Sequence, residues 1–138
     1  MPEPIFTSLS DATPSPRRRL RVLVADDDHD AVATLEALLL NEGHQVMGVY
    51  QGKEVLRLTR DFKPDAVLLD ISMPGLSGYD VARELREVYG DHAPLLIAVT
   101  AWTMPSDRIL ALMVGFDHHV SKPYDPQALL ALLNDETK

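Results

Sequence analysis

The chain has 138 residues, 46% of them hydrophobic and 25% charged, which suits one globular domain and is too short for two ordinary ones. Its net charge of −8 disfavours nucleic acid as the main partner, and no apolar run approaches the roughly 20 residues that span a bilayer. The lack of cysteine excludes disulfides, thiolate nucleophiles and cysteine-based zinc sites. No secretory signal opens the chain, so a cytoplasmic protein is expected.

The first 19 residues differ in composition from the rest of the chain. They contain serine, threonine and four prolines, which are Pro2, Pro4, Pro14 and Pro16. Closely spaced prolines oppose regular structure, so residues 1–19 are expected to form a flexible extension. The closing Arg17–Arg19 is interpreted as a solvated lead-in to the first strand, with a docking or lipid-facing patch as the alternative.

From residue 20 onward, apolar segments of strand length alternate with segments of helical spacing. The strand candidates are Leu20–Ala25, Val46–Val49, Ala66–Leu69, Leu95–Val99 and His118–Ser121. The helical stripes that follow them are Val32-Leu35-Leu38-Leu39, Val55-Leu58-Phe62, Val81-Leu85-Val88, Ile109-Leu112-Met113 and Ala128-Leu129-Leu133. This order predicts one α/β domain over residues 20–135, a doubly wound parallel sheet of five strands with five helices on its two faces.

Polar residues follow four of these strands at the point where each strand ends. They are Asp26-Asp27, Asp70, Thr100 and Lys122. Because the carboxyl ends of parallel strands lie together, these groups are expected to meet in one crevice. Clustered carboxylates with a hydroxyl and an ammonium suit a magnesium ion and a phosphoryl group.

Asp70 is the candidate nucleophile, since a carboxylate can attack phosphorus to give an aspartyl phosphate. The turn that follows it would hold the backbone carbonyl of Ser72 near the crevice as a metal ligand. Each residue also has a plainer interpretation. Asp70 taken alone is a polar strand end, and Asp26–Asp28 taken alone is a solvated loop that caps the next helix.

Four motifs in this order resemble the receiver domain of two-component response regulators, over about Leu20 to Leu133. They are Val22-Leu23-Val24-Ala25-Asp26-Asp27, Leu68-Leu69-Asp70-Ile71-Ser72-Met73-Pro74-Gly75-Leu76-Ser77-Gly78, Val99-Thr100-Ala101 and Val120-Ser121-Lys122-Pro123. The resemblance implies a flavodoxin-like sheet of order 2-1-3-4-5. It also implies that Asp70 accepts a phosphoryl group from a histidine kinase or a histidine phosphotransfer protein.

The resemblance further implies roles for the remaining site residues. Mg²⁺ would be held by Asp27, Asp70 and the Ser72 carbonyl, with Asp26 acting through water. Thr100 and Lys122 would contact the phosphoryl group, and the Lys122–Pro123 bond would be cis. The chain would catalyse its own magnesium-dependent phosphorylation and dephosphorylation, and would not be an enzyme acting on other substrates.

Two positions depart from what the family leads us to expect. The family's switch pairs the threonine with an aromatic residue three positions before the lysine, and here that residue is His119. Thr100 and His119 are therefore the candidate switch residues. Trp102, two positions after Thr100, is interpreted either as a packing residue or as a lid that shields the acyl phosphate from water.

The resemblance also implies a surface that binds an output protein, which the sequence does not identify. This surface would consist of Ser106–Gly115, His118–Ser121 and Pro126–Leu133. The first of these segments has more apolar residues than one buried stripe requires, because of either a docking surface or extra core burial. With nothing after Lys138, a stand-alone receiver or the receiver of a hybrid kinase is expected. The rival interpretations are a degenerate receiver that only binds protein, a flavin carrier and an aspartate-based phosphatase.

Overall fold

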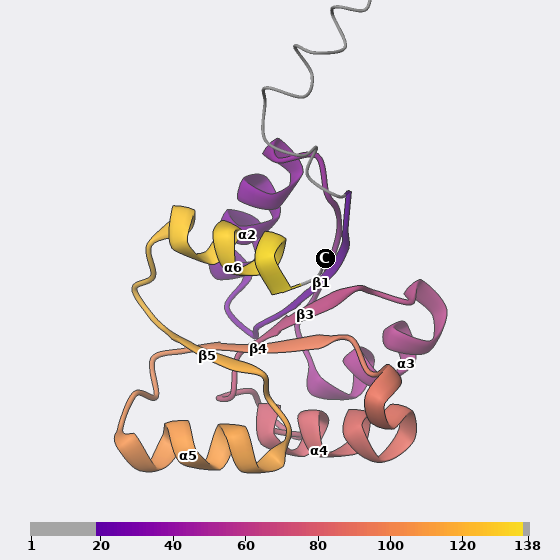
Figure 1. Ribbon diagram of the computed structural model, residues 1–138, viewed down its shortest axis with the longest axis vertical. Coiled ribbons are helices and arrows are strands. Elements are labelled where there is room, and N and C mark those ends of the chain that lie inside the picture. Colours follow the sequence, from indigo (N-terminus) through magenta and orange to yellow (C-terminus); the bar gives the residue numbers. More distant parts are fainter. Residues whose placement is uncertain (1–18, 137–138) are drawn as a thin grey trace, which may run out of the picture.

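Five parallel strands form the central sheet of the computed structural model, which describes residues 19–136 (Figure 1). The strands are β1 (Arg21–Ala25), β2 (Gln45–Val49), β3 (Ala66–Leu69), β4 (Leu95–Thr100) and β5 (His118–Ser121). Their order is β2-β1-β3-β4-β5, as the resemblance implied. β1 and β3 are the strands best suited to the centre, because every residue of β3 and nearly every residue of β1 is buried.

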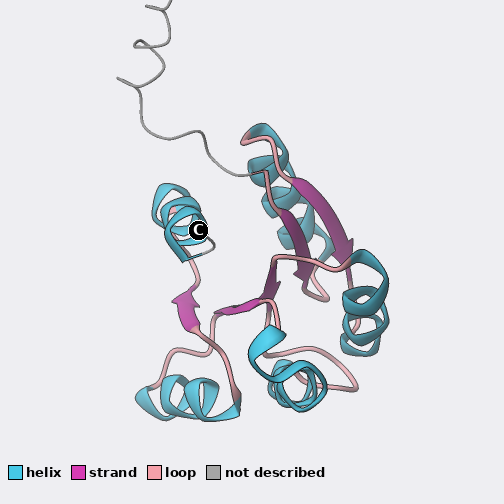
Figure 2. Ribbon diagram, turned by 45° about the vertical axis from the view of Figure 1, so that its right-hand side comes forward, coloured by secondary structure: helices cyan, strands magenta, loops and turns pink. Residues whose placement is uncertain are grey.

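Helices cover both faces of the sheet (Figure 2). They are α2 (His29–Asn41), α3 (Gly52–Phe62), α4 (Gly78–Tyr89), α5 (Pro105–Val114) and α6 (Pro126–Glu136), with a short 3₁₀ turn η1 (Gly90–His92) after α4. One hydrophobic cluster joins α2 and α6 to the sheet, and a second joins α3, α4 and α5 to it. The sheet is thus buried between two helical layers, as the doubly wound prediction requires.

Local signals account for where the helices start. Asp28 caps α2, because its side chain accepts hydrogen bonds from the backbone N–H groups of Asp30 and Ala31. Ser77 and Asp80 form a reciprocal capping box at the start of α4. Gly78, the next residue, lies against the backbone of Asp70, where a Cβ would come within 2.6 Å of the Asp70 carbonyl oxygen. Glycine therefore lets α4 begin directly beside the end of β3.

The predicted strands agree with the observed ones to within one residue at each end. The predicted domain, residues 20–135, contains all of them, whereas the predicted extension lies outside the described residues except for Arg19. Within the described part of the chain, no helix has the length and apolar character needed to cross a membrane.

The stripe predicted for α5 is oriented differently from the stripes of α2 and α3. Ile109, Leu112 and Met113 are 59%, 59% and 77% exposed, and α5 instead buries Ala111 and Val114. Ala111 and Val114 therefore form the buried face of α5, and its larger apolar side chains face outward. Extra core burial is therefore the wrong explanation for the apolar excess of this helix.

Candidate functional site

The residues predicted at the strand ends meet at the carboxyl edge of the sheet. Asp26 follows β1, Asp70 follows β3, Thr100 ends β4 and Lys122 follows β5. The first three are 4%, 8% and 0% exposed, whereas Asp27 is exposed to solvent. Two buried carboxylates at one edge require a compensating positive charge, because burying an unpaired charge is costly.

Lys122 supplies that charge. Its Nζ donates to Asp26 Oδ2 at 2.6 Å and to Asp70 Oδ2 at 3.3 Å. The other oxygen of each carboxylate holds its own loop. Asp26 Oδ1 accepts from the N–H of Asp28 at 3.0 Å, and Asp70 Oδ1 accepts from the N–H of Ser72 at 3.1 Å. Each aspartate therefore orders a loop with one oxygen and presents the other to the ammonium.

The surroundings of Asp70 influence its protonation in opposite directions. Burial raises the pKa of the Asp70 carboxyl above its ordinary value, and the negative charge of Asp26 adds to this. The hydrogen bond from the Ser72 backbone and the charge of Lys122 lower the pKa, without cancelling the rise. The carboxylate is thus less stabilised by its neighbours than an aspartate in a simple salt bridge.

Lys122 is held in its charged form. Burial is the largest single influence and lowers the pKa of the ammonium, but Asp26 and Asp70 together outweigh it and raise the pKa. A permanently charged ammonium that contacts two carboxylates can also neutralise the oxygens of an incoming anion.

The acidic cluster, which consists of Asp26, Asp27 and Asp70, fits a hard divalent cation. One carboxylate oxygen from each residue lies within 4.8 Å of the others. Three carboxylates against one ammonium leave excess negative charge, and oxygen ligands are those that Mg²⁺ prefers. The donor set of this cluster therefore agrees with the predicted magnesium site.

A surface hollow of about 400 Å³ lies beside the cluster. Its lining includes Asp27, Ser72, Met73, Pro74 and Trp102. Trp102 is 44% exposed, and its ring is tilted against that of Tyr79 with 6.4 Å between centroids. The side chain therefore serves as part of the wall of this hollow as well as packing on α4.

The backbone of Trp102 links the side chains of Thr100 and His119 by hydrogen bonds. The Trp102 N–H donates to Thr100 Oγ1 at 3.2 Å, and His119 Nε2 lies 2.9 Å from the Trp102 carbonyl oxygen, to which it donates. His119 Nδ1 is buried and has no hydrogen-bond partner among residues 19–136. Each of the three residues is a candidate from the sequence alone, but no sequence pattern predicts that the Trp102 peptide connects the other two.

His29 and Asp28 have local roles, as the plainer interpretations suggested. His29 begins α2, and its ring stacks on Tyr50 with 3.8 Å between centroids and an interplanar angle of 1°. Asp28 is the cap of α2 and contributes no ligand to the acidic cluster. The predicted cis bond between Lys122 and Pro123 is confirmed.

This fold, with an acidic cluster and a lysine at the carboxyl edge of the sheet, defines a receiver domain, and the comparison with protein families agrees. The model of the response regulator receiver domain matches residues 22–134, so the chain belongs to that family. It is therefore a receiver domain of two-component signalling, a function consistent with control by phosphorylation.

Two curated relatives illustrate the range of the family. The chain is 38% identical over 113 residues to the DNA-binding response regulator MtrA of Mycolicibacterium smegmatis, over 82% of this chain and 48% of that protein. It is 35% identical over 114 residues to Protein PilH of Pseudomonas aeruginosa, over 83% of this chain and 94% of that protein. The chain thus spans about half the length of MtrA but nearly all of PilH.

Solved structures resemble the fold throughout the domain. The BeF₃-activated N-terminal receiver domain of Klebsiella pneumoniae RstA superposes with a TM-score of 0.80 at 26% identity. This match covers 86% of the present chain and 98% of the RstA domain.

Proposed function

We propose that Asp70 accepts a phosphoryl group from a phosphohistidine on a histidine kinase or a histidine phosphotransfer protein. The observation that carries the proposal is the shared hydrogen bonding of Lys122 to Asp26 and Asp70 beside an exposed Asp27. One oxygen of Asp70 attacks phosphorus, the bond from phosphorus to the donor's imidazole nitrogen breaks, and the imidazole leaves with a proton from water. An acyl phosphate results.

In this proposal each neighbour of Asp70 has a defined task. The Ser72 N–H holds one Asp70 oxygen in place, which leaves the other directed toward the donor. Lys122 moves its ammonium from the carboxylate to a phosphoryl oxygen, and the Thr100 hydroxyl donates to a second one.

Asp26, Asp27, Asp70 and the carbonyl of Ser72 would hold Mg²⁺, with Asp26 acting through water. The ion would offset charge on the transferring oxygens and on the crowded carboxylates. This assignment is supported by the 4.8 Å grouping of the three side chains. The same donor set makes the proposed self-catalysed phosphorylation and dephosphorylation magnesium-dependent.

The switch would pass from Thr100 to His119 through the β4–α5 loop. If Thr100 turns toward a phosphoryl group, it gives up the hydrogen bond from the Trp102 N–H, and the loop that His119 contacts is released. Phosphorylation adds about −1.5 to −2 charges, enough to favour this rearrangement. An output protein would then read α5, β5 and α6.

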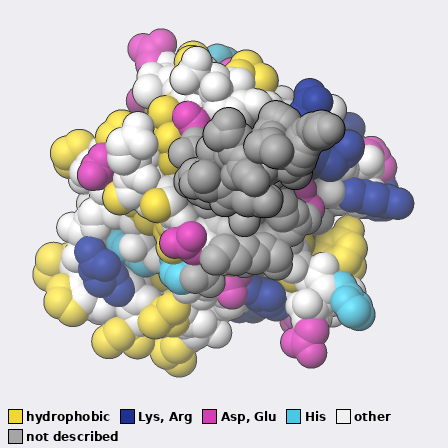
Figure 3. Space-filling model, turned by 45° about the horizontal axis from the view of Figure 1, so that its top comes forward, with side chains coloured by type: hydrophobic (Ala, Val, Ile, Leu, Met, Phe, Trp, Pro, Cys, Tyr) yellow, Lys and Arg dark blue, Asp and Glu magenta, His cyan; other side chains and the backbone are white. Residues whose placement is uncertain are grey.

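The exposed apolar side chains of α5 support that output face. Ile109, Leu112 and Met113 lie on α5, and Figure 3 shows hydrophobic side chains gathered at the lower left, the side on which α5 lies in Figure 1.

A phosphoryl donor of this kind belongs to the cytoplasm, which is where we propose that the chain acts. Nothing among the matches favours the degenerate, binding-only alternative.

The decisive experiment incubates the protein with acetyl phosphate, with and without magnesium, and follows its intact mass. We expect a phosphoryl adduct that needs magnesium and that is absent from Asp70→Asn. Asp65→Asn is the matched control, because Asp65 is a carboxylate at the opposite edge of the sheet.

An adduct on Asp70→Asn would overturn the assignment of the acceptor. A folded parent protein that takes no phosphoryl group from acetyl phosphate or from a phosphorylated kinase would favour the binding-only alternative.

A further inference from the structure

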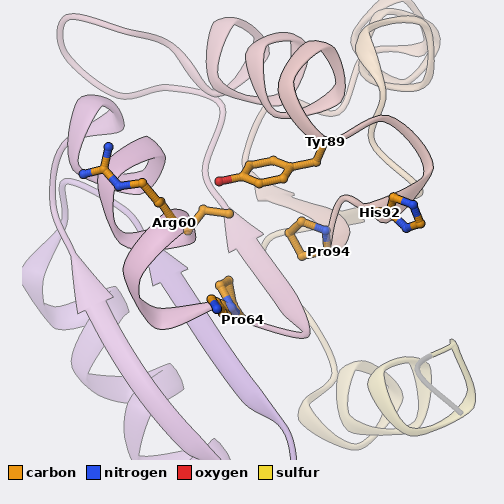
Figure 4. Close-up of a pocket in the computed structure, with 7 residues that line it drawn as sticks. Arg60, Pro64, Tyr89, His92 and Pro94 are labelled. Carbon is orange, nitrogen blue, oxygen red and sulfur yellow. The ribbon is translucent and has the colours of Figure 1, made fainter.

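A second hollow lies at the amino edge of the sheet, away from the acidic cluster. It has a volume of about 340 Å³ and lies between the end of α3 and the end of α4. Pro64, two residues before β3, and Pro94, directly before β4, form its buried floor (Figure 4). Tyr89 projects from the last turn of α4 toward the helix that carries Arg60 (Figure 4). We call this feature the α3–α4 hollow.

The rim of the α3–α4 hollow carries positive charge. Arg60, Lys63 and His92 line it together with Tyr89, and no carboxylate belongs to the lining. Arg60 and Lys63 also end a basic stripe on α3, which consists of Lys53, Arg57, Arg60 and Lys63. These residues recur every three or four positions and are all exposed, so they lie on the solvent face of the helix.

The positive charge of the stripe contrasts with the overall charge of the chain. The basic stripe holds four of the 13 Lys and Arg residues of a chain whose net charge is −8. Figure 3 shows Lys and Arg side chains together at the right-hand edge, the side on which α3 lies in Figure 1. In the part of the chain that the structure describes, only Arg60 of the stripe takes part in an ion pair, with Asp61 at 3.3 Å.

Stabilisation of α3 does not explain the stripe. Cations favour the carboxyl end of a helix, which accounts for Arg60 in the last turn and Lys63 after it. Lys53 lies in the first turn, where the helix dipole disfavours a cation. Among residues 19–136, Arg60 is the one cation of this row with an ion-pair partner, and the row continues to the rim of the hollow. Such a row is better explained by a ligand than by the fold.

We propose that the basic stripe and the α3–α4 hollow dock an acidic peptide segment of a partner protein, which inserts one apolar side chain into the hollow. The stripe is about 15 Å long at the helical rise, the length of roughly five extended residues. The hollow can hold one large side chain over its proline floor, next to Tyr89. Carboxylates on either side of that anchor meet the cations of the rim.

Other occupants agree less well with the same features. A nucleic acid backbone would be repelled by a chain of net charge −8, and an anionic membrane surface would not reach into a hollow. The α3–α4 hollow lies at the edge of the sheet opposite to Asp70, and the stripe lies on the solvent face of α3, so the proposed docking does not require phosphorylation of Asp70.

The test titrates the whole chain into a fluorescently labelled peptide at about 50 mM salt and measures the anisotropy of the label. The peptide has about ten residues, with glutamates on both sides of one phenylalanine. We expect micromolar binding, weakened at least tenfold by the double variant Arg60→Gln with Lys63→Gln. Arg83→Gln, an exposed arginine on α4 outside the hollow, is the control and should change binding less than twofold. Replacing the peptide's phenylalanine by alanine should also weaken binding at least fivefold.

Three results would overturn the proposal. One is no binding of the peptide at millimolar concentration, and another is an equal loss in Arg83→Gln. The third is tighter binding of an oligothymidylate or of phosphatidylserine vesicles than of the peptide, with the same dependence on Arg60 and Lys63. Acetyl phosphate labelling of the double variant should remain normal, which shows that it folds and separates this test from that of Asp70.

Discussion

The two edges of the sheet use aspartate for different purposes. At the amino edge, Asp65 accepts from the N–H of Arg21 at 2.8 Å, and Asp117 accepts from the N–H of Leu96 at 2.8 Å. At the carboxyl edge, Asp26 and Asp70 face each other across the ammonium of Lys122. The first pair holds strands in place, whereas the second pair gathers charge of one sign around a single cation.

The difference shows that partners, and not residue type, decide what a carboxylate can do. Asp117 has its Oδ2 engaged by both a backbone N–H and the guanidinium of Arg86, so it has compensation of its own. Asp26 and Asp70 share one ammonium. A site with shared compensation responds strongly when another anion or cation enters, and this suits the carboxyl edge to signalling.

The largest expected effect is that of removing the shared cation. Lys122→Met leaves the buried carboxylates of Asp26 and Asp70 without a counter-charge. We expect a loss of about 3 kcal/mol in the free energy of unfolding without magnesium, the lower end of the range for a broken buried pair, because Lys122 keeps 26% exposure. Urea unfolding followed by circular dichroism measures this. A loss below about 0.5 kcal/mol, no larger than that of an ordinary surface substitution, would contradict the shared-cation account.

At the amino edge, Asp117→Ala should lower the free energy of unfolding by about 2 kcal/mol, because it leaves the N–H of the buried Leu96 without its acceptor. Acetyl phosphate labelling of Asp70 should be unchanged. Asp61→Ala removes an exposed carboxylate whose ion pair within residues 19–136 is with Arg60, and it should change the free energy of unfolding by less than about 0.5 kcal/mol. Loss of labelling in Asp117→Ala while the variant is folded would show that the two edges are coupled.

The pH dependence of stability sharpens the comparison further. The folded state raises the pKa of Asp70 above its ordinary value of 3.8, so the native state binds more protons than the unfolded state just above that pH. Asp70 therefore makes stability fall as the pH rises through this window. We expect Asp70→Asn to remove this decrease in stability with rising pH. The variant should be more stable than the parent at neutral pH, by an amount smaller than the losses expected for Lys122→Met and Asp117→Ala.

Thermal unfolding between about pH 4 and pH 7 measures this difference, with Asp65→Asn as the control. An Asp70→Asn variant that is less stable than the parent at neutral pH would contradict the expected direction.

The smallest expected effect concerns the wall of the hollow beside Asp70. Trp102→Ala should speed the loss of the acyl phosphate a few-fold, less than about 1 kcal/mol in activation free energy, because water gains access. Phosphate release after removal of the donor measures the rate. Met104→Ala is the control, since Met104 is exposed on the same loop but does not line the hollow. An equal or slower loss in Trp102→Ala would exclude shielding.

Much of this molecule could be predicted from local patterns. The segments Ala66–Leu69 and Leu95–Val99 are apolar throughout, which is typical of strands buried on both faces. The rule that parallel strands end at one edge then brings Asp26, Asp70 and Lys122 together without any further information.

The parts that could not be predicted depend on contacts between distant segments. α5 buries Ala111 and Val114 and exposes its larger apolar side chains, an orientation that depends on packing and that apolar periodicity does not encode. The α3–α4 hollow joins Arg60 to Tyr89, from two helices whose packing no local motif specifies.

The hydrogen bond between Lys122 and Asp26 joins positions 96 residues apart in the chain. Every strand of the sheet except β2 carries or directly precedes a residue of the site, so the site exists only when β1, β3, β4 and β5 are all in register. A chain that has been cut before β5, or that has not yet added it, lacks the lysine and its counter-charge. If Asp70 takes up phosphate as proposed, its labelling would also report that β1, β3, β4 and β5 have assembled, and chains that lack β5 would not signal.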